Sequence, residues 1–434
     1  MSFPKYPAYK PSGVPWLGDV PEHWEVKRLK YNLCLLTEKT NSRNNPVALE
    51  NIESWSGRFI STETEFEGDG IAFERGDILF GKLRPYLAKA LLADKAGEAV
   101  GDFHVMRPQA QIEPRFAQYA ILNRSFIDMV DGSTFGSKMP RVSWEFLGNM
   151  LTPTPPLSEQ SAIATFLTRE TSKIDALVAE QQKLIALLKE KRQAVISHAV
   201  TKGLDPSVPM KDSGVEWLGE VPEHWDVVPM KRACGLLKDG THLPPPRVDD
   251  GIPLLSVRNL QEGIFGLLDD DSFISEQSYN ELCRGFIPQA NDVLLAIVGA
   301  TLGKTAVIPN NLGKFHIQRS LAIFRTLGIL HPHWLWYLFQ SKGFQALLWE
   351  YVGYSAQPGI YLGTLSEFKI PLPHLQEQEN LLAYLSNETT KFDTLIAEAQ
   401  SAIALLQERR TALISAAVTG KMDVRGIIAK EIDL

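Results

Sequence analysis

Two long stretches of the chain carry apolar residues at the spacing of an amphipathic helix. Neither 159–201 nor 377–419 contains glycine or proline. Apolar side chains recur at intervals of three, four and seven residues, which places them along one helix face. Each stretch of about 43 residues would extend roughly 65 Å as a helix. The predicted seams are Ile174, Leu177, Leu184, Leu188 and Val195 in the first helix, and Phe392, Leu395, Ala402, Leu406 and Leu413 in the second.

Local signals bound both predicted helices. Pro156 and Pro373 precede them, Ser158 is a candidate N-cap, and Gly203 and Gly420 follow their last turns. The simpler interpretation is that each helix packs only on its own domain. The two apolar stripes match, however, and each is longer than one small domain could cover. We therefore expect the helices to pair antiparallel.

The segments before the two helices mix strand-like and helix-like patterns. Short β-rich runs are bounded by glycine and charged residues, as expected of strands, and more helical stretches follow them. The strand candidates are 76–83 and 291–299, and the helical stretches begin near Pro114 and His331. Residues 28–150 and 229–370 are therefore predicted to be two mixed α/β folds that are weakly related to each other.

An internal repeat organises the whole chain. SGVPWLGDVPEHWEV (12–26) recurs as SGVEWLGEVPEHWDV (213–227), with 12 of 15 positions identical. A second block, SEQSAIATFL from Ser158, matches QEQENLLAYL from Gln376. The first blocks are offset by 201 residues and the second by 218, so the intervening segment is 17 residues longer in the second copy. A long repeat that occurs twice predicts a duplicated half with a pseudo-two-fold axis.

The predicted architecture is mixed α/β, or α+β, with two globular domains joined by two long antiparallel coiled-coil helices. The predicted boundaries are 1–157 for the first domain, 158–205 for the first helix, 206–374 for the second domain, and 375–434 for the second helix and the C-terminal tail. The ends of each half are similar while the middles differ, which indicates a fixed frame that carries two interchangeable middles.

Composition narrows the class of protein. The chain has 434 residues, of which 44% are hydrophobic, enough for two to four domains with real cores. No run of about 18 apolar residues and no signal-peptide core occur, and three scattered cysteines suit a reducing compartment, so we expect a cytoplasmic protein. The net charge of −7 argues mildly against a nucleic-acid partner. A local basic surface could still bind one.

Three motifs suggest chemistry but have simpler interpretations. VGATLGKT (298–305) resembles a phosphate-binding loop but is one residue short, so we predict strand, turn, strand. The PEHW pairs, His23–Trp24 and His224–Trp225, have no second ligand at metal-binding spacing, so we expect each Trp to pack where the domain enters the frame. No catalytic constellation stands out. The chain is predicted to be non-catalytic, with no metal and no cofactor of its own.

Polar and basic side chains gather in glycine-rich loops of both middle segments. Arg, Lys, Asn and Gln carry the chemistry that recognises base edges, and Ser, Thr and Lys serve phosphates. Each alone reads more simply as a solvated side chain. The candidate DNA-binding residues are Lys82, Arg84, Tyr86, Ser137, Lys138 and Arg141 in the first middle, and His242, Arg247, Arg258, Asn259, Lys304, Gln318, Arg319, Tyr354 and Gln357 in the second.

The pattern resembles the specificity subunit of type I restriction–modification systems. The likeness covers essentially the whole chain and is most specific in the WLG-x-VPEHW repeats, in PPLSEQ and PHLQEQ, and in the helix tails ISHAVTKG and ISAAVTGK. It implies that two target-recognition domains each read one half of a split, asymmetric DNA site. It further implies that two methyltransferase subunits dock on the helices and that restriction and motor subunits join them. S-adenosylmethionine, ATP and Mg would then bind to those partner chains.

Two alternatives stay open at this point. The chain could be an interaction scaffold, with two domains on a coiled coil that bind proteins rather than DNA. It could also serve a methyltransferase that lacks a nuclease. Salt dependence of binding separates the first alternative from a DNA reader, because phosphate contacts weaken steeply as salt rises.

Overall fold

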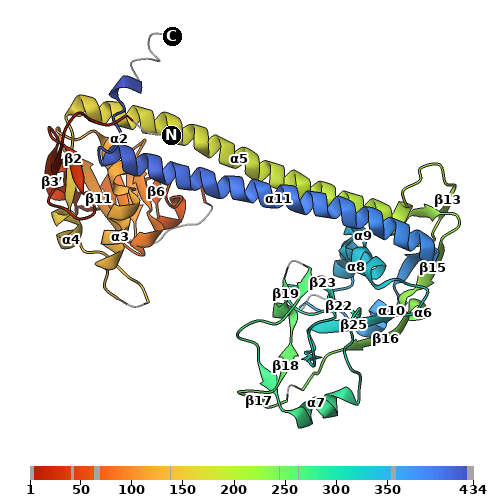
Figure 1. Ribbon diagram of the computed structural model, residues 1–434. Helices are drawn as coiled ribbons and strands as arrows, with labels where there is room; N and C mark the ends of the chain where they lie inside the picture. The colour runs from red at the N-terminus through yellow and green to blue at the C-terminus, as the bar shows by residue number, and fades with distance from the viewer. Residues whose placement is uncertain are drawn as a thin grey trace. The chain divides into compact units, whose positions relative to one another are not determined.

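The computed structural model describes residues 4–40, 44–62, 69–136, 138–243, 245–261, 263–352 and 358–427. The chain forms two compact units, one made of residues 1–182 with 401–434 and the other of residues 183–400. Each unit combines one globular α/β part with part of both long helices (Figure 1). These units cut across both helices, so the four-part division predicted from the sequence remains a prediction.

The long helices are α5 (Leu157–Lys202, 46 residues) and α11 (Leu375–Val418, 44 residues). Both end at a glycine in the left-handed region, Gly203 with φ +73° and Gly420 with φ +74°, as the sequence predicted. The N-cap prediction for Ser158 is wrong, because α5 already begins at Leu157. The backbone carbonyl of Pro156 accepts the first helical bonds instead.

The helices pair through repeat-equivalent residues in both units. In the first unit Arg410 Nε donates to Asp175 Oδ1 at 3.0 Å, and in the second Arg192 Nε donates to Asp393 Oδ1 at 2.9 Å. The two aspartates are 218 residues apart, as are the two arginines, which is the offset of the repeat. Residue numbers that rise along α5 meet numbers that fall along α11, so the predicted antiparallel pairing is confirmed.

The predicted seam is only partly right. Ile174, Leu188 and Leu413 are buried, and Val195, Phe392, Ala402 and Leu406 are half-buried. Three other predicted members are exposed: Leu177 (45%), Leu184 (43%) and Leu395 (46%). Apolar residues occur side by side at 177–178 and 184–185, and the helix turns the second of each pair inward. Val178 accordingly packs on the first core.

Among the described residues, each unit contains two four-stranded sheets, and we call the one with the longer strands the larger sheet. The larger sheet is antiparallel and has the same topology in both units. In the first unit its order is β4 (Leu33–Leu36), β11 (Phe103–Pro108), β8 (Ile78–Gly81), β9 (Ala90–Leu92). In the second it is β16 (Cys234–Asp239), β25 (Leu321–Thr326), β22 (Val293–Ala296), β23 (Thr305–Val307). Strands predicted at 76–83 and 291–299 are therefore present. Residues 298–304 form the turn of the β22–β23 hairpin, which confirms the strand–turn–strand interpretation.

Smaller elements complete each unit. The first contains β1 (Tyr9–Pro11), β2 (Asp19–Pro21), β3 (Glu25–Arg28), β5 (Lys39–Thr40), β6 (Pro46–Val47), β7 (Gly70–Phe73), β10 (Gly97–Val100), β12 (Leu151–Thr154), α1 (Leu29–Asn32), α2 (Pro114–Ile121), α3 (Arg124–Gly132) and α4 (Trp144–Asn149). The second contains β13 (Met210–Asp212), β14 (Glu220–Pro222), β15 (Asp226–Pro229), β17 (Arg247–Val248), β18 (Ile252–Leu255), β19 (Leu260–Gln261), β20 (Ile264–Phe265), β21 (Phe273–Ile274), β24 (His316–Ile317), β26 (Lys369–Leu372), α6 (Met230–Ala233), α7 (Glu276–Cys283), α8 (Pro332–Gln340), α9 (Lys342–Glu350) and α10 (Leu362–Glu367).

The PEHW repeats anchor each globular part to the start of its long helix. Trp24 is fully buried, and its indole N–H donates to Glu159 Oε2 at 3.0 Å while His23 Nε2 lies 2.6 Å from Glu159 Oε1. The second unit repeats this arrangement with Glu377, which accepts from the Trp225 indole at 3.0 Å. The structural interpretation of the tryptophans is confirmed. Their glutamate partners were not predicted from the sequence, although both glutamates lie in the repeated block.

A second pair of polar contacts is also duplicated. The Gln160 side chain accepts from the Glu113 amide at 2.7 Å and donates to the Pro155 carbonyl at 2.8 Å. Gln378 makes the same two bonds, from the His331 amide and to the Pro373 carbonyl, each at 2.8 Å. Buried amides that are fully hydrogen-bonded fix one geometry. The repeated residues therefore form a common frame for two different globular parts.

Composition raised two further points, the state of the cysteines and the presence of a membrane-spanning helix. Cys34, Cys234 and Cys283 are free thiols. Across the described ranges, every helix is too short or too polar to cross a lipid bilayer.

Candidate nucleic-acid interface

Most candidate residues of the first unit lie at one edge of the larger sheet. The end of β8 and the starts of β9 and β11 meet there, since Gly81 pairs with Phe103 and Phe80 with Ala90. The loop 82–87 leaves this edge, and the loop 133–142 lies beside it, because the Arg84 amide donates to the Pro140 carbonyl at 2.8 Å. We call residues 82–87 with 133–142 the loop edge of the first unit.

The loop edge of the first unit mixes basic and exposed apolar side chains. It contains Lys82, Arg84, Tyr86, Lys138 and Arg141, whereas Ser137 lies outside the described residues. Phe135 (62% exposed) and Met139 also stand on its surface, and neither is among the candidates predicted from the sequence. Apolar residues in a glycine-rich loop, such as these two, were the signal in the sequence that could have identified them. Exposed aromatic rings among cations are typical of nucleic-acid-binding surfaces.

Asp102 partly neutralises this edge. Arg141 donates to both of its carboxylate oxygens, at 3.3 and 2.8 Å, and Lys82 Nζ lies 3.5 Å away. The Arg141 hydrogen bond, with smaller contributions from the charges of Arg141 and Lys82, lowers the pKa of Asp102. Arg84 is exposed and has a left-handed backbone, with φ 51°. Such a conformation costs a non-glycine residue on the order of 1 kcal/mol, and it is often found at functional sites.

The second unit builds its loop edge with the same backbone bonds. The Gly299 amide donates to the Pro358 carbonyl at 2.8 Å, and the Ile360 amide donates to the Ile297 carbonyl at 3.0 Å. The loop after β16 joins them, since the Arg319 amide donates to the Thr241 carbonyl at 3.2 Å. We call residues 240–243, 297–304, 318–320 and 358–360 the loop edge of the second unit.

Several candidates of the second unit stand on this edge. His242 is exposed and its Nε2 lies 2.7 Å from Asp239, Arg319 is exposed, and Lys304 projects from the β22–β23 turn. Gln318 is half-buried and donates to the Leu254 carbonyl at 3.3 Å. Arg247 is exposed but belongs to β17, in the smaller sheet. Tyr354 and Gln357 lie outside the described residues.

The prediction that Asn259 contacts DNA is wrong. Its side chain is only 2% exposed, and its Oδ1 accepts from the Ser256 amide at 2.9 Å. Its Nδ2 donates to the Gly266 carbonyl at 3.0 Å and to Asp271 at 2.9 Å. Every polar atom is thus used to close a local turn. Asn51 closes the matching turn in the first unit, where its Oδ1 accepts from the Ala48 amide at 2.9 Å.

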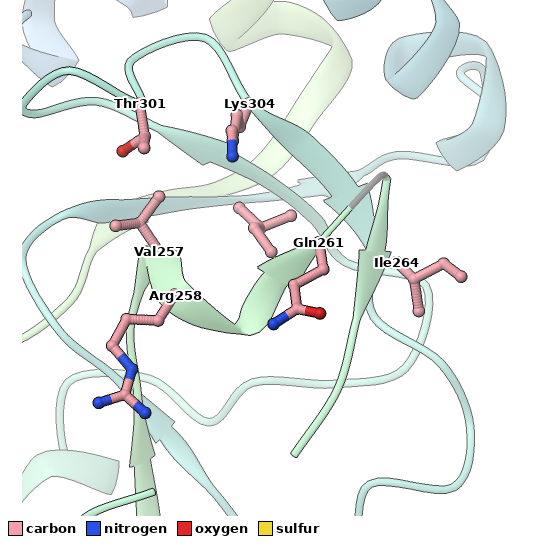
Figure 2. A pocket seen from close by; sticks show the side chains of 7 residues that line it. Val257, Arg258, Gln261, Ile264, Thr301 and Lys304 are labelled. Atoms are coloured by element: carbon pink, nitrogen blue, oxygen red, sulfur yellow. The ribbon is translucent and has the colours of Figure 1, made fainter. Parts of the chain in front are cut away.

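A cavity of about 710 Å³, lined by both polar and apolar side chains, adjoins the loop edge of the second unit (Figure 2). Thr301 and Lys304 reach it from the β22–β23 turn, and Val257, Arg258, Leu260, Gln261 and Ile264 line the facing side. Arg258 forms an ion pair with Asp270. Among the described residues, no group of three or more His, Cys, Asp or Glu side chains is placed to hold a metal ion.

The fold and the two loop edges define a duplicated, two-module binding protein on a helical frame. Residues 248–404 match the family model described as the type I restriction modification DNA specificity domain. The MjaVIII specificity subunit of Methanocaldococcus jannaschii is 24% identical over 446 residues, covering 94% of this chain and 95% of that protein. The EcoBI specificity subunit of Escherichia coli is also 24% identical, over 71% of this chain and 65% of its own length.

Solved structures share the fold over nearly the whole chain. One is described as "Structural basis underlying complex assembly and conformational transition of the type I R-M system", with a TM-score of 0.71, 18% identity, and coverage of 92% of this chain and 98% of the other. The HsdS subunit from Thermoanaerobacter tengcongensis gives a TM-score of 0.50, also at 18% identity, with coverage of 93% and 98%. The sequence matches support the resemblance to specificity subunits of type I restriction–modification systems that the sequence predicted.

Proposed function

We propose that this chain reads a bipartite, asymmetric DNA target, one half with each globular unit. The observation that carries the proposal is the pair of loop edges. Both are assembled by the same backbone hydrogen bonds at the same sheet edge, yet they present different side chains. A constant scaffold with two different polar surfaces is what two different half-sites would require.

The local charge at the edges supports a DNA ligand despite the net charge of −7. Exposed Arg84 and Lys138 in the first unit, and Arg319 and Lys304 in the second, can each bind a phosphate. Exposed Phe135 provides a ring for stacking. Exposed cations thus stand on the loop edge of each unit, as a DNA ligand would require.

We further propose that the chain has no catalytic role of its own. Methyltransferase subunits would dock on the helices, restriction and motor subunits would join them, and S-adenosylmethionine, ATP and Mg would bind to those chains. The frame supports two copies of one docking partner, because the exposed residues Glu22 and His23 recur as Glu223 and His224. A duplicated surface can be recognised twice by the same protein.

The test is single-molecule methylation mapping of DNA from cells with and without this gene, with the methyltransferase present in both. We expect one split, asymmetric adenine-methylation motif to disappear with the gene. Complementation with the full chain should restore it, and a chain with the first loop edge replaced should restore a motif altered in one half only. An unchanged methylation pattern, with active methyltransferase in the cells, would refute the specificity role in favour of a protein scaffold.

A further inference from the structure

The cavity of the second unit corresponds to a region of the first unit in which the matching lysine is hydrogen-bonded internally. The turn closed by Asn51 matches the turn closed by Asn259, and Lys89 matches Lys304 at the start of the paired strand. Lys89 Nζ donates to the Leu49 carbonyl at 2.7 Å, and its burial lowers the pKa of Lys89. Lys304 is exposed and lines open space instead.

The facing hairpin differs in the same sense. In the first unit Glu53 and Arg58 close it with an ion pair at 2.7 Å. The matching positions in the second unit are Gln261 and Ile264, which cannot form that pair and which line the cavity. The carboxylate of Glu53, which pairs with Arg58, thus corresponds to the neutral amide of Gln261, which can both donate and accept hydrogen bonds. Among the described residues, Lys304 and Gln261 therefore line a recess in the second unit, whereas their counterparts Lys89 and Glu53 make internal bonds in the first.

Resting on the proposed function, we propose that this recess binds DNA of the second half-site, with Lys304 on a phosphate and Gln261 on a base edge. Thr301, on the same turn as Lys304, offers a hydroxyl to the same phosphate. Figure 2 shows both side chains extending from the turn toward the segment that carries Gln261. A glutamine amide pairs with both the N6 and N7 positions of adenine, so adenine is the base this residue favours.

Arg258 also lines the recess, but its charge is engaged in an ion pair with Asp270. Its side chain is 52% exposed and is paired with Asp270, whose side chain is 78% exposed. The negative charge of Asp270 repels DNA phosphates, and its ion pair with Arg258 keeps that arginine from binding a phosphate. Removing this carboxylate should strengthen DNA binding, whereas removing Lys304 should weaken it. Opposite directions from two neighbouring substitutions would not arise from a general loss of folding.

The experiment measures DNA binding by the full chain assembled with its methyltransferase subunits, over a series of salt concentrations and with each base of the site varied in turn. Lys304→Ala should weaken binding to all sequences and reduce the slope of log K against log salt by about 0.9, one phosphate contact. Gln261→Ala should relax one position of the second half-site, with discrimination there falling about tenfold. Asp270→Asn should steepen the slope by about the same 0.9.

The matched control is Lys89→Ala in the first unit. It removes the equivalent lysine where the amine is bound internally, so the DNA affinity and the salt slope should not change. Unchanged affinity in Lys304→Ala, or unchanged discrimination at every base in Gln261→Ala, would overturn the recess as a DNA site while the wild-type complex still bound its target. A wild-type complex without sequence preference would instead overturn the proposed function itself.

Discussion

The two helix–helix ion pairs provide a direct test of how burial sets the strength of one interaction. Asp175–Arg410 and Asp393–Arg192 are repeat equivalents with similar N–O distances, 3.0 and 2.9 Å. The side chains of the first pair are 20% and 12% exposed, while those of the second are 56% and 22% exposed. Arg410 also donates to the Trp55 carbonyl at 3.1 Å. The first pair should therefore be the stronger.

The expected magnitudes follow from that exposure. A charge-assisted bond in a partly buried site contributes about 1.5–3 kcal/mol, and an exposed pair about 0.2–1 kcal/mol. Arg410→Ala should lower the free energy of unfolding by about 3 kcal/mol. This cost exceeds the coupling energy of the pair, because the substitution leaves Asp175 and the Trp55 carbonyl without their partner. Arg192→Ala removes a pair in which Asp393 can be solvated by water.

Double-mutant cycles with alanine at both positions of each pair isolate the coupling energies. The readout is amide hydrogen exchange of peptides from α5 and α11, followed by mass spectrometry, since it reports local opening in each unit separately. The Arg192–Asp393 cycle serves as the matched control for the Asp175–Arg410 cycle. Equal coupling in the two cycles, or coupling near zero for Asp175–Arg410, would refute the reasoning.

Three further predictions concern stability and specificity. Burial lowers the pKa of His104 and of His316, so the unfolded chain binds protons that the folded chain does not. The free energy of unfolding should therefore decline as pH falls through about 6.5. The urea midpoints at pH 5.5 and 7.5 should differ less in a variant with glutamine at both positions than in the wild type. Asn259→Ala should cost about 2–3 kcal/mol in urea unfolding, while a DNA-binding defect at unchanged stability would contradict its internal role. Replacing 28–150 by the middle of a relative should change one half of the methylation motif, and a change in both halves would contradict independent readers.

The sequence predicts the frame well because the repeat reports on it directly. Residues that must make the same contacts twice, such as Trp24 and Trp225, are identical in both copies. Long helices without glycine or proline leave few alternatives to a helical pair. The antiparallel arrangement is predicted from the duplication and the matching apolar stripes, and two ion pairs related by the same offset of 218 residues confirm it.

The sequence predicts the seam and the candidate site less well, for different physical reasons. Leu177 and Val178 are both apolar, and only the partner helix decides which of them is buried. Asn259 has the chemistry of a base-reading residue, but closing a tight turn uses the same donors and acceptors. Residue type therefore identifies a possible contact, and the backbone around the residue determines whether it is available.

The two loop edges differ in how their cations are balanced. In the first unit Asp102, at the start of β11, binds Arg141 and Lys82. The matching position before β25 in the second unit is Ser320, which carries no charge. Within the described residues Lys304 and Arg319 accordingly have no carboxylate partner within ion-pair distance.

This difference in balance has a consequence for affinity. A cation that must leave a carboxylate before it meets a phosphate gains less from DNA than a cation that is solvated by water. Lys82 and Arg141 should therefore each contribute less to the salt-dependent affinity than Lys304 and Arg319. The first unit also presents exposed Phe135 and the left-handed Arg84 on its loops. One scaffold can thus read two half-sites with different balances of charge and shape.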